Sequence, residues 1–127
     1  MEVEYVISEI IQSAYEVHRA LPPGYLEPVY QRAMEVELSL RGIPYISQYP
    51  LKVVYKGICI GEYRPDILVD NKVIVELKAV EAVLPIHEVQ TVNYLQITGL
   101  DNGLLINFGS DRIDIRRKFR LYHKPKD

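Results

Sequence analysis

The first forty residues carry the spacing of two helices. Apolar side chains recur three or four positions apart at Val3, Val6, Ile7, Ile10, Ile11, Ala14, Val17 and Leu21. This pattern predicts an amphipathic helix over residues 2–20, which the Pro-Pro-Gly run at 22–24 ends. A second helix is predicted over residues 26–41, with Glu27 as N-cap, Pro28 in its first turn and Gly42 just after its end.

Strand patterns follow from residue 45 onward. Short runs rich in Val, Ile and Tyr at 45–49, 51–55 and 58–63 predict an antiparallel meander, and Pro50 indicates an edge or a bulge. A helix over residues 85–98 is expected to end at Gly99. The apolar run 103–108 predicts a buried strand, parallel to the strand ending at Lys78 because a helix crosses between them. A half-exposed strand at 112–120 comes last, and the tail from His123 is expected to fray.

These elements alternate in the manner of one α/β domain spanning residues 1–127. We expect a central mixed sheet of five or six strands, flanked by two helices that precede it and one helix that crosses over it. No apolar run approaches the roughly 20 residues that span a membrane, and the acidic amino terminus does not resemble a signal peptide. We therefore expect no membrane association and a cytoplasmic location.

The segment from Asp66 to Lys78 is the most informative stretch. Two apolar runs flank the turn signal at residues 70–72, which predicts a β-hairpin. Because side chains alternate along a strand, Glu76 and Lys78 share one face and Leu77 points into the core. A two-residue loop would place Asp66 opposite Val75, whereas a three-residue loop ending in a bulge would place Asp66 opposite Glu76, within roughly 5 Å at Cβ. We predict the second register.

Two carboxylates on one face repel each other, and a single ammonium relieves only part of that repulsion. A divalent cation such as Mg²⁺ prefers oxygen ligands and is commonly held by one or two carboxylates together with substrate phosphate. The lysine can orient water or neutralise charge that develops on the phosphate. The cluster of Asp66, Glu76 and Lys78 therefore predicts hydrolysis of a phosphodiester. A purely structural ion-pair network is the alternative.

Charge and cysteine content modify this picture. The net charge of −2 argues against a binder driven only by salt-sensitive contacts with nucleic acid. The distribution is uneven, with +4 over residues 111–127 and −6 over residues 1–110. A basic end could attract a polyanion, or it could simply be a solvated strand and tail. The single cysteine, Cys59, lies in an apolar run and is interpreted as a small buried hydrophobe in a reducing compartment.

Several motifs together carry a family resemblance. Pro65-Asp66, followed ten residues later by Glu76-Leu77-Lys78, matches the motif of the PD-(D/E)XK nuclease superfamily. The run GYLEPVY at 24–30 resembles the signature of the GxxExxY protein family within that superfamily. Further matching stretches, in the same order as in the family, are EVH at 16–18, VIVELKAVE at 73–81, His87, Gln90, NYL at 93–95 and GLLINF at 103–108.

The resemblance implies a restriction-endonuclease-like core and a nuclease that leaves a 5′-phosphate. It implies one or two Mg²⁺ or Mn²⁺ ions, held by Asp66, Glu76, the Leu77 carbonyl and, directly or through water, Glu27. Lys78 would position or activate the attacking water, and Gln90 would help to place it. The implied partner is nucleic acid, DNA in preference to RNA. A carboxylate that only complements the helix dipole is the other interpretation of Glu27.

Five further residues are candidates for contacting substrate. Tyr30 could lie near substrate or belong to the core, and Arg64 could hold a phosphate or form a surface ion pair. His87 and Tyr94 share a polar stripe with Gln90 on the helix at 85–98, where a solvent-facing side is the other interpretation. His18 ends the first apolar stripe and could line the site or be structural.

The rival function is a catalytically silent module that keeps the nuclease fold and binds nucleic acid or regulates a partner. The short chain leaves open a homodimer or a partner protein.

Overall fold

The computed structural model describes residues 1–121; the expected fraying from His123 lies outside this range. It contains the helices α1 (Val3–Ala20), α2 (Glu27–Leu40) and α3 (Pro85–Thr98), and the strands β1 (Tyr45–Ser47), β2 (Leu51–Tyr55), β3 (Ile58–Tyr63), β4 (Ile67–Val69), β5 (Val73–Lys78), β6 (Asn102–Asn107) and β7 (Asp114–Phe119). All three predicted helices and every predicted strand are present, with ends that shift by at most a few residues. The mixed α/β fold is thereby confirmed.

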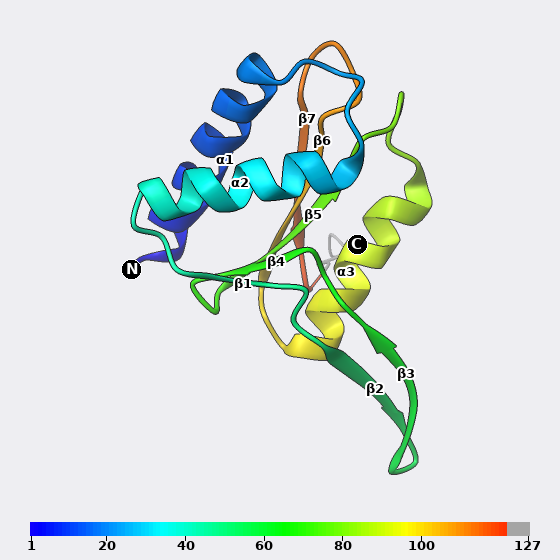
Figure 1. Ribbon diagram of the computed structural model, residues 1–127. Coiled ribbons are helices and arrows are strands. Elements are labelled where there is room, and N and C mark those ends of the chain that lie inside the picture. The colour runs from blue at the N-terminus through cyan, green and yellow to red at the C-terminus, as the bar shows by residue number, and fades with distance from the viewer. Residues whose placement is uncertain (122–127) are drawn as a thin grey trace, which may run out of the picture.

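Five strands form one mixed sheet in the order β1-β4-β5-β6-β7. The β5–β6 pair is parallel, as predicted from the crossing helix, and the other neighbouring pairs are antiparallel. Helices α1 and α2 cover one face of this sheet and α3 lies on the other, as Figure 1 shows from one side. The central strands β4, β5 and β6 are therefore buried on both faces.

The two faces have separate cores because strand side chains alternate. On β5, Val73, Val75 and Leu77 pack toward α1 and α2, whereas Ile74 packs against Tyr94 and its neighbours on α3. The predicted inward direction of Leu77 is confirmed, since its side chain is fully buried. By the same alternation, Glu76 and Lys78 project on the α3 side.

Two local predictions about α2 and the meander were wrong. Leu26, not Glu27, is the N-cap of α2, and Glu27 is the first helical residue. Strand β1 pairs with β4 instead of β2, so only the β2–β3 pair of the expected antiparallel meander forms. The residues between β1 and β2 explain this, because Gln48 takes a positive φ of 55° and Pro50 follows, which turns the chain out of the sheet.

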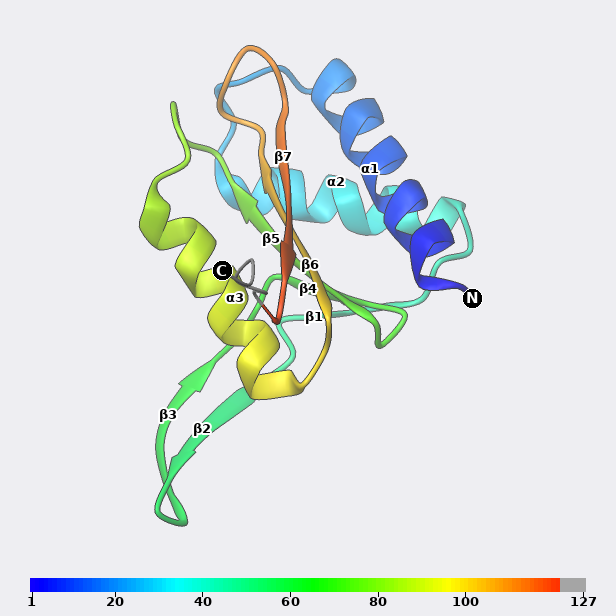
Figure 2. The same ribbon diagram turned by 180° about the vertical axis from the view of Figure 1, so that it is seen from behind.

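Strands β2 and β3 form a separate two-stranded hairpin that projects from the body, which Figures 1 and 2 show from opposite sides. We call residues 51–63 the arm. Its base packs against α3 through Leu51 and Tyr63, whereas Val54, Tyr55, Ile58 and Ile60 are 59–67% exposed. Cys59 is also exposed, which contradicts the prediction of a buried thiol. The apolar run at residues 58–60 predicts burial from the sequence alone. In the fold it is exposed because the hairpin that contains it projects from the sheet.

Among the residues described, no helix has the length and apolar character needed to cross a membrane.

Candidate active site

The hairpin of β4 and β5 places the two motif carboxylates side by side. Val69 pairs with Val73 and Ile67 with Val75, so three residues form the loop and Asp66 falls opposite Glu76. The predicted register is confirmed. The pair is also interlocked, because the Asp66 amide donates to Glu76 Oε1 at 2.8 Å and the Leu77 amide donates to Asp66 Oδ2 at 2.7 Å.

The loop owes this register to residues that tolerate left-handed backbone. Asp70 and Asn71 take φ values of 50° and 53°, and Asp and Asn adopt this region more readily than most side chains. The Lys72 amide closes the turn on the Val69 carbonyl at 2.9 Å. A local turn at residues 70–72 thus determines the alignment of carboxylates at the far end of both strands.

The carboxyl pair is largely buried from solvent. Glu76 is only 5% exposed, and burial, together with the charge of Asp66, raises its pKa to about 8. Burial also raises the pKa of Asp66, although the Leu77 amide and the Lys78 charge oppose the shift. Near neutral pH and without a cation, the pair therefore retains one proton.

Glu27 and Lys78 complete the cluster. The pKa of Glu27 is raised, first by burial and then by the charge of Asp66. Lys78 lies close enough to lower the pKa of all three carboxyls. The start of α2 and the end of β5 thus bring these side chains to one place, although they are far apart in sequence.

Two glutamines that the sequence did not single out hold Asp66 in place. Gln31 Nε2 donates to the Asp66 carbonyl at 3.0 Å, and the Gln48 amide donates to the same oxygen at 3.0 Å. The two side chains also join each other at 3.2 Å. Gln31 lies one residue after the GxxExxY match, but its spacing from Asp66 gives no signal, because the contact depends on how α2 crosses the sheet.

Asn107 was also missed, and it supports the chain just after Lys78. Its buried side chain accepts from the Val80 amide at 3.0 Å and donates to the Val80 carbonyl at 2.9 Å. Gly109 passes so close to the Val80 backbone that a Cβ would overlap it. The only signal in the sequence is a polar residue inside the apolar run 103–108.

Helix α3 presents its polar stripe to the cluster. Tyr94 lies near enough to Glu76 and Asp66 for their charges to add to burial in raising its pKa, and Gln90 acts on the same hydroxyl in the opposite direction. Burial and the Lys78 charge lower the pKa of His87, whose Nδ1 accepts from the Leu84 amide at 3.1 Å. Tyr94 therefore lies beside the carboxylates, with Gln90 at its hydroxyl and His87 near Lys78.

Tyr30 and His18 have structural contacts. Tyr30 is fully buried, stacks on Phe108 at 4.8 Å between ring centroids and donates to the Pro22 carbonyl at 2.9 Å. Its burial contradicts the substrate-contact role and favours the core alternative, in which it ties the loop before α2. His18 Nε2 lies 3.0 Å from the Ser110 carbonyl, which joins α1 to the loop after β6.

The basic residues are largely engaged with acids. Arg64 pairs with Glu62 at 2.8 Å, so the surface ion pair is the arrangement observed. Three cations on β7, and Arg120 just after it, are paired with acids: Arg116 with Asp114 and Glu88, Arg117 with Glu4, Lys118 with Glu88, and Arg120 with Asp101.

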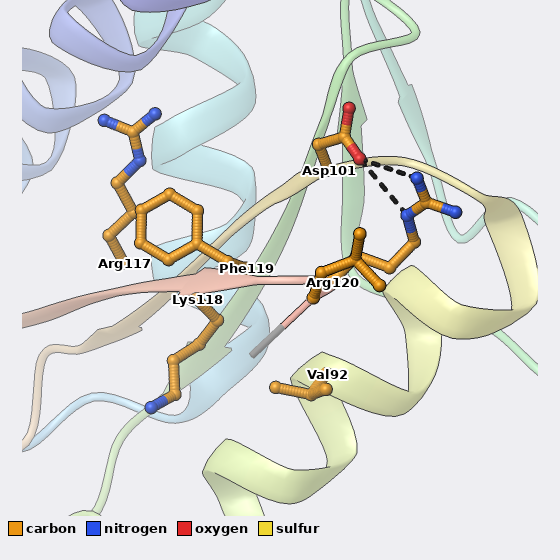
Figure 3. Close-up of a pocket in the computed structure, with 7 residues that line it drawn as sticks. Val92, Asp101, Arg117, Lys118, Phe119 and Arg120 are labelled. Atoms are coloured by element: carbon orange, nitrogen blue, oxygen red, sulfur yellow. Dashed lines mark hydrogen bonds and ion pairs between the residues drawn. The ribbon is translucent and has the colours of Figure 1, made fainter. Parts of the chain in front are cut away.

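A cavity of about 590 Å³ lies beside three of these cations, Arg117, Lys118 and Arg120. Figure 3 shows the residues that line it. It lies at the end of the sheet opposite the carboxylates. Phe119 pairs with Asn102 and Asn102 with Val73, which is the end of β5 remote from Lys78. This cavity is therefore not part of the candidate site.

The donor set fits a hard divalent cation. Three carboxyls with raised pKa values lie together, and the single positive charge of Lys78 does not balance them. In residues 1–121, no group of three or more Asp, Glu, His or Cys side chains lies in a ligating arrangement. Two carboxylates and a backbone carbonyl, completed by water and phosphate, are enough for Mg²⁺. Glu27 is then suited to act through water.

Comparison with known proteins defines the class. Residues 4–118 match the family model of the PD-(D/E)XK nuclease superfamily, and the chain belongs to that superfamily. No curated protein matches the chain at a significant level. The crystal structure of a protein named SSO0001 superposes with a TM-score of 0.58 at 17% identity, over 76% of this chain and 50% of that one. The chain thus spans about half of that structure, which supports the fold alone.

Proposed function

We propose that this protein is a metal-dependent nuclease that hydrolyses phosphodiester bonds. The observation that carries the proposal is the interlocked pair of Asp66 and Glu76 with Lys78 on the same face. Such a pair is costly to bury without a cation, which indicates that the arrangement serves chemistry instead of stability.

Each residue has a distinct part in this proposal. Asp66, Glu76 and the Leu77 carbonyl hold Mg²⁺ or Mn²⁺, and Glu27 contributes through water. When bound, the ion supplies Lewis-acid activation of the phosphate. Lys78 positions the attacking water and offsets the negative charge that grows on the phosphate oxygens. Gln90 helps to place that water from α3.

Finer assignments belong to the same proposal. We place the chain in the GxxExxY family on its motifs, with DNA in preference to RNA as substrate. The chain acts as one domain, and its single cysteine agrees with a reducing, cytoplasmic setting.

The first test is cleavage of a panel of linear, circular, branched and single-stranded DNA and RNA with Mn²⁺ or Mg²⁺. Lys78→Ala is expected to abolish cleavage while the circular dichroism spectrum stays unchanged. Lys72→Ala is the matched control, because Lys72 lies in the same hairpin but pairs only with Asp70 at 3.1 Å. Cleavage by Lys78→Ala at the wild-type rate would refute the assignment.

The exposed arm favours a second element of function, association with another chain. Large apolar side chains at 54, 55, 58 and 60 leave a surface that soluble proteins usually cover. We propose that the arms of two copies pack together. Sedimentation at increasing concentration should show a dimer, and a bifunctional thiol reagent should link the two Cys59 side chains. Wild type that stays monomeric at all concentrations would exclude this association. A dimer that Ile58→Lys does not disrupt would exclude the arm as its interface.

A silent binding module is the rival to catalysis. It predicts retained Mn²⁺ and nucleic-acid binding without cleavage of any substrate in the panel. That result would refute the catalytic role proposed for Lys78 and would support nucleic-acid binding as the function.

A further inference from the structure

A cavity of about 260 Å³ lies between the end of the arm and one face of α3. Tyr63, the last residue of β3, forms one wall, and Ile86, Gln90, Asn93 and Tyr94 contribute to the other. Pockets for drug-sized ligands start near 300 Å³, so this cavity suits a smaller group.

The cavity adjoins the carboxylate cluster. Tyr94 lines the cavity and also lies within the electrostatic reach of Glu76 and Asp66. His87, another lining residue, lies within reach of the Lys78 charge. On the other wall, only two residues separate Tyr63 from Asp66. A group in this cavity would therefore be the immediate neighbour of a phosphodiester held at the site.

The lining has two kinds of surface. Tyr63 is 47% exposed and meets Tyr94 edge to face at 5.9 Å between ring centroids, so part of its ring is accessible for stacking. Ile86 adds apolar surface and is 63% exposed. The carboxamides of Gln90 and Asn93 supply donors and acceptors in the same cavity. Together these features fit a flat aromatic ring that carries polar groups on its edge.

We propose that this cavity binds one unpaired nucleobase next to the scissile phosphate, with Tyr63 as the stacking platform and Asn93 at the base edge. The inference rests on the proposed nuclease function and names its substrate class. A paired base is stacked on both faces, so it cannot enter such a cavity unless it leaves the helix. The substrate is therefore single-stranded nucleic acid or a duplex with an unpaired nucleotide at the cut.

Binding of a fluorescein-labelled single-stranded DNA oligonucleotide, measured by anisotropy in a Lys78→Ala background, tests this directly. Tyr63→Ala should weaken binding about tenfold, because stacking on an aromatic side chain contributes substantially to the binding of each base. Tyr63→Phe keeps the ring and should bind within twofold of its parent. Tyr5→Ala is the matched control, since Tyr5 is similarly exposed, at 50%, but lies on α1.

A second series uses oligonucleotides with a single abasic position. One abasic position should weaken binding by the parent protein about as much as Tyr63→Ala does, and should weaken Tyr63→Ala no further. Asn93 is exposed on α3, so the helix should tolerate Asn93→Ala. This change should alter the preference among bases more than the overall affinity for the oligonucleotide. Equal losses for Tyr63→Ala on abasic and complete oligonucleotides, or no loss at all, would overturn the proposal.

These readouts separate the two proposals. Cleavage by wild type with no effect of Tyr63→Ala on binding would refute the base cavity and keep the nuclease. Tyr63-dependent binding with no cleavage of any substrate would keep the cavity and refute catalysis.

Discussion

The proton shared by Asp66 and Glu76 links this protein's stability to pH. The Glu76 pKa rises from 4.5 to about 8 in the fold, so the folded state binds more protons than the unfolded chain between these values. The resulting stabilisation is complete below pH 4.5 and is lost as the pH rises through 8. A divalent cation would displace the proton, which couples metal affinity to pH.

Glu76→Gln should remove this dependence from the metal-free protein. Between pH 6 and pH 9 in EDTA, we expect the unfolding free energy of wild type to fall by on the order of 2 kcal/mol more than that of the variant, because the variant cannot ionise. Urea denaturation at both pH values measures this difference. Glu81→Gln, an exposed control in the loop after β5, should behave as wild type. Parallel curves for wild type and Glu76→Gln would contradict the burial argument.

Gln31 acts on the site through Asp66. Its side chain donates to the Asp66 carbonyl, so Gln31→Ala should loosen the motif without removing a ligand. Changes to groups that orient ligands typically lower metal affinity about 10- to 100-fold. Mn²⁺ titration by calorimetry should show a weakening of about tenfold. Gln12→Ala, which removes only a bond to Ser8 on α1, should leave the affinity unchanged.

Packing between β6 and the segment after β5 determines where Lys78 stands. The Asn107 side chain and the close approach of Gly109 hold Val80, two residues beyond Lys78. Lys78 is further tied to this strand because its carbonyl accepts from the Phe108 amide at 2.8 Å. The position of Lys78 therefore depends on contacts with β6 and the residues after it as well as on its own strand, β5.

Gly109→Ala tests that packing. A Cβ at this position would overlap the Val80 backbone, which cannot move as a flexible side chain could, so we expect a loss of about 2 kcal/mol or more. Gly61→Ala is the control, because nothing lies within 4 Å of its added Cβ and its φ is not left-handed. Thermal unfolding of both variants distinguishes them. Equal melting temperatures would show that the segment after Lys78 is free to shift.

Within residues 1–121, most cations of the basic carboxyl-terminal segment are paired with acids in the fold. The cations of β7 and Arg120 pair with acids on α1, on α3, on β7 itself and at Asp101, at distances of 2.6–3.2 Å. Their cavity also lies at the opposite end of the sheet from the carboxylates. The basic segment therefore offers little free positive charge for a polyanion within the described residues.

Removing two of these cations should accordingly have little effect on nucleic-acid binding. For Arg117→Gln with Arg120→Gln, we expect the affinity and its dependence on salt to stay within twofold of wild type. Each lost phosphate contact would instead lower the slope of log K against log salt by about 0.7 to 0.9. Anisotropy titrations at several salt concentrations measure this slope. A slope reduced by nearly two would show that these arginines leave their acidic partners to bind phosphate.

Local patterns in the sequence were enough for the elements and for the register of the motif. Helix and strand periods are set by neighbouring residues, so α1, α3 and β5 were placed within a residue or two. The turn at residues 70–72 and the alternation along β5 then put Asp66 opposite Glu76. These features depend on short stretches of backbone, so the local amino-acid sequence is enough to predict them.

Contacts between distant segments were decided only by the tertiary structure. The departure of the arm from the sheet exposed Cys59, and the docking of α2 buried Tyr30 and brought Gln31 to Asp66. The cavity at Tyr63 likewise exists only because the base of the arm meets α3. Such contacts depend on how layers pack, and packing joins residues whose separation along the chain carries no periodic signal.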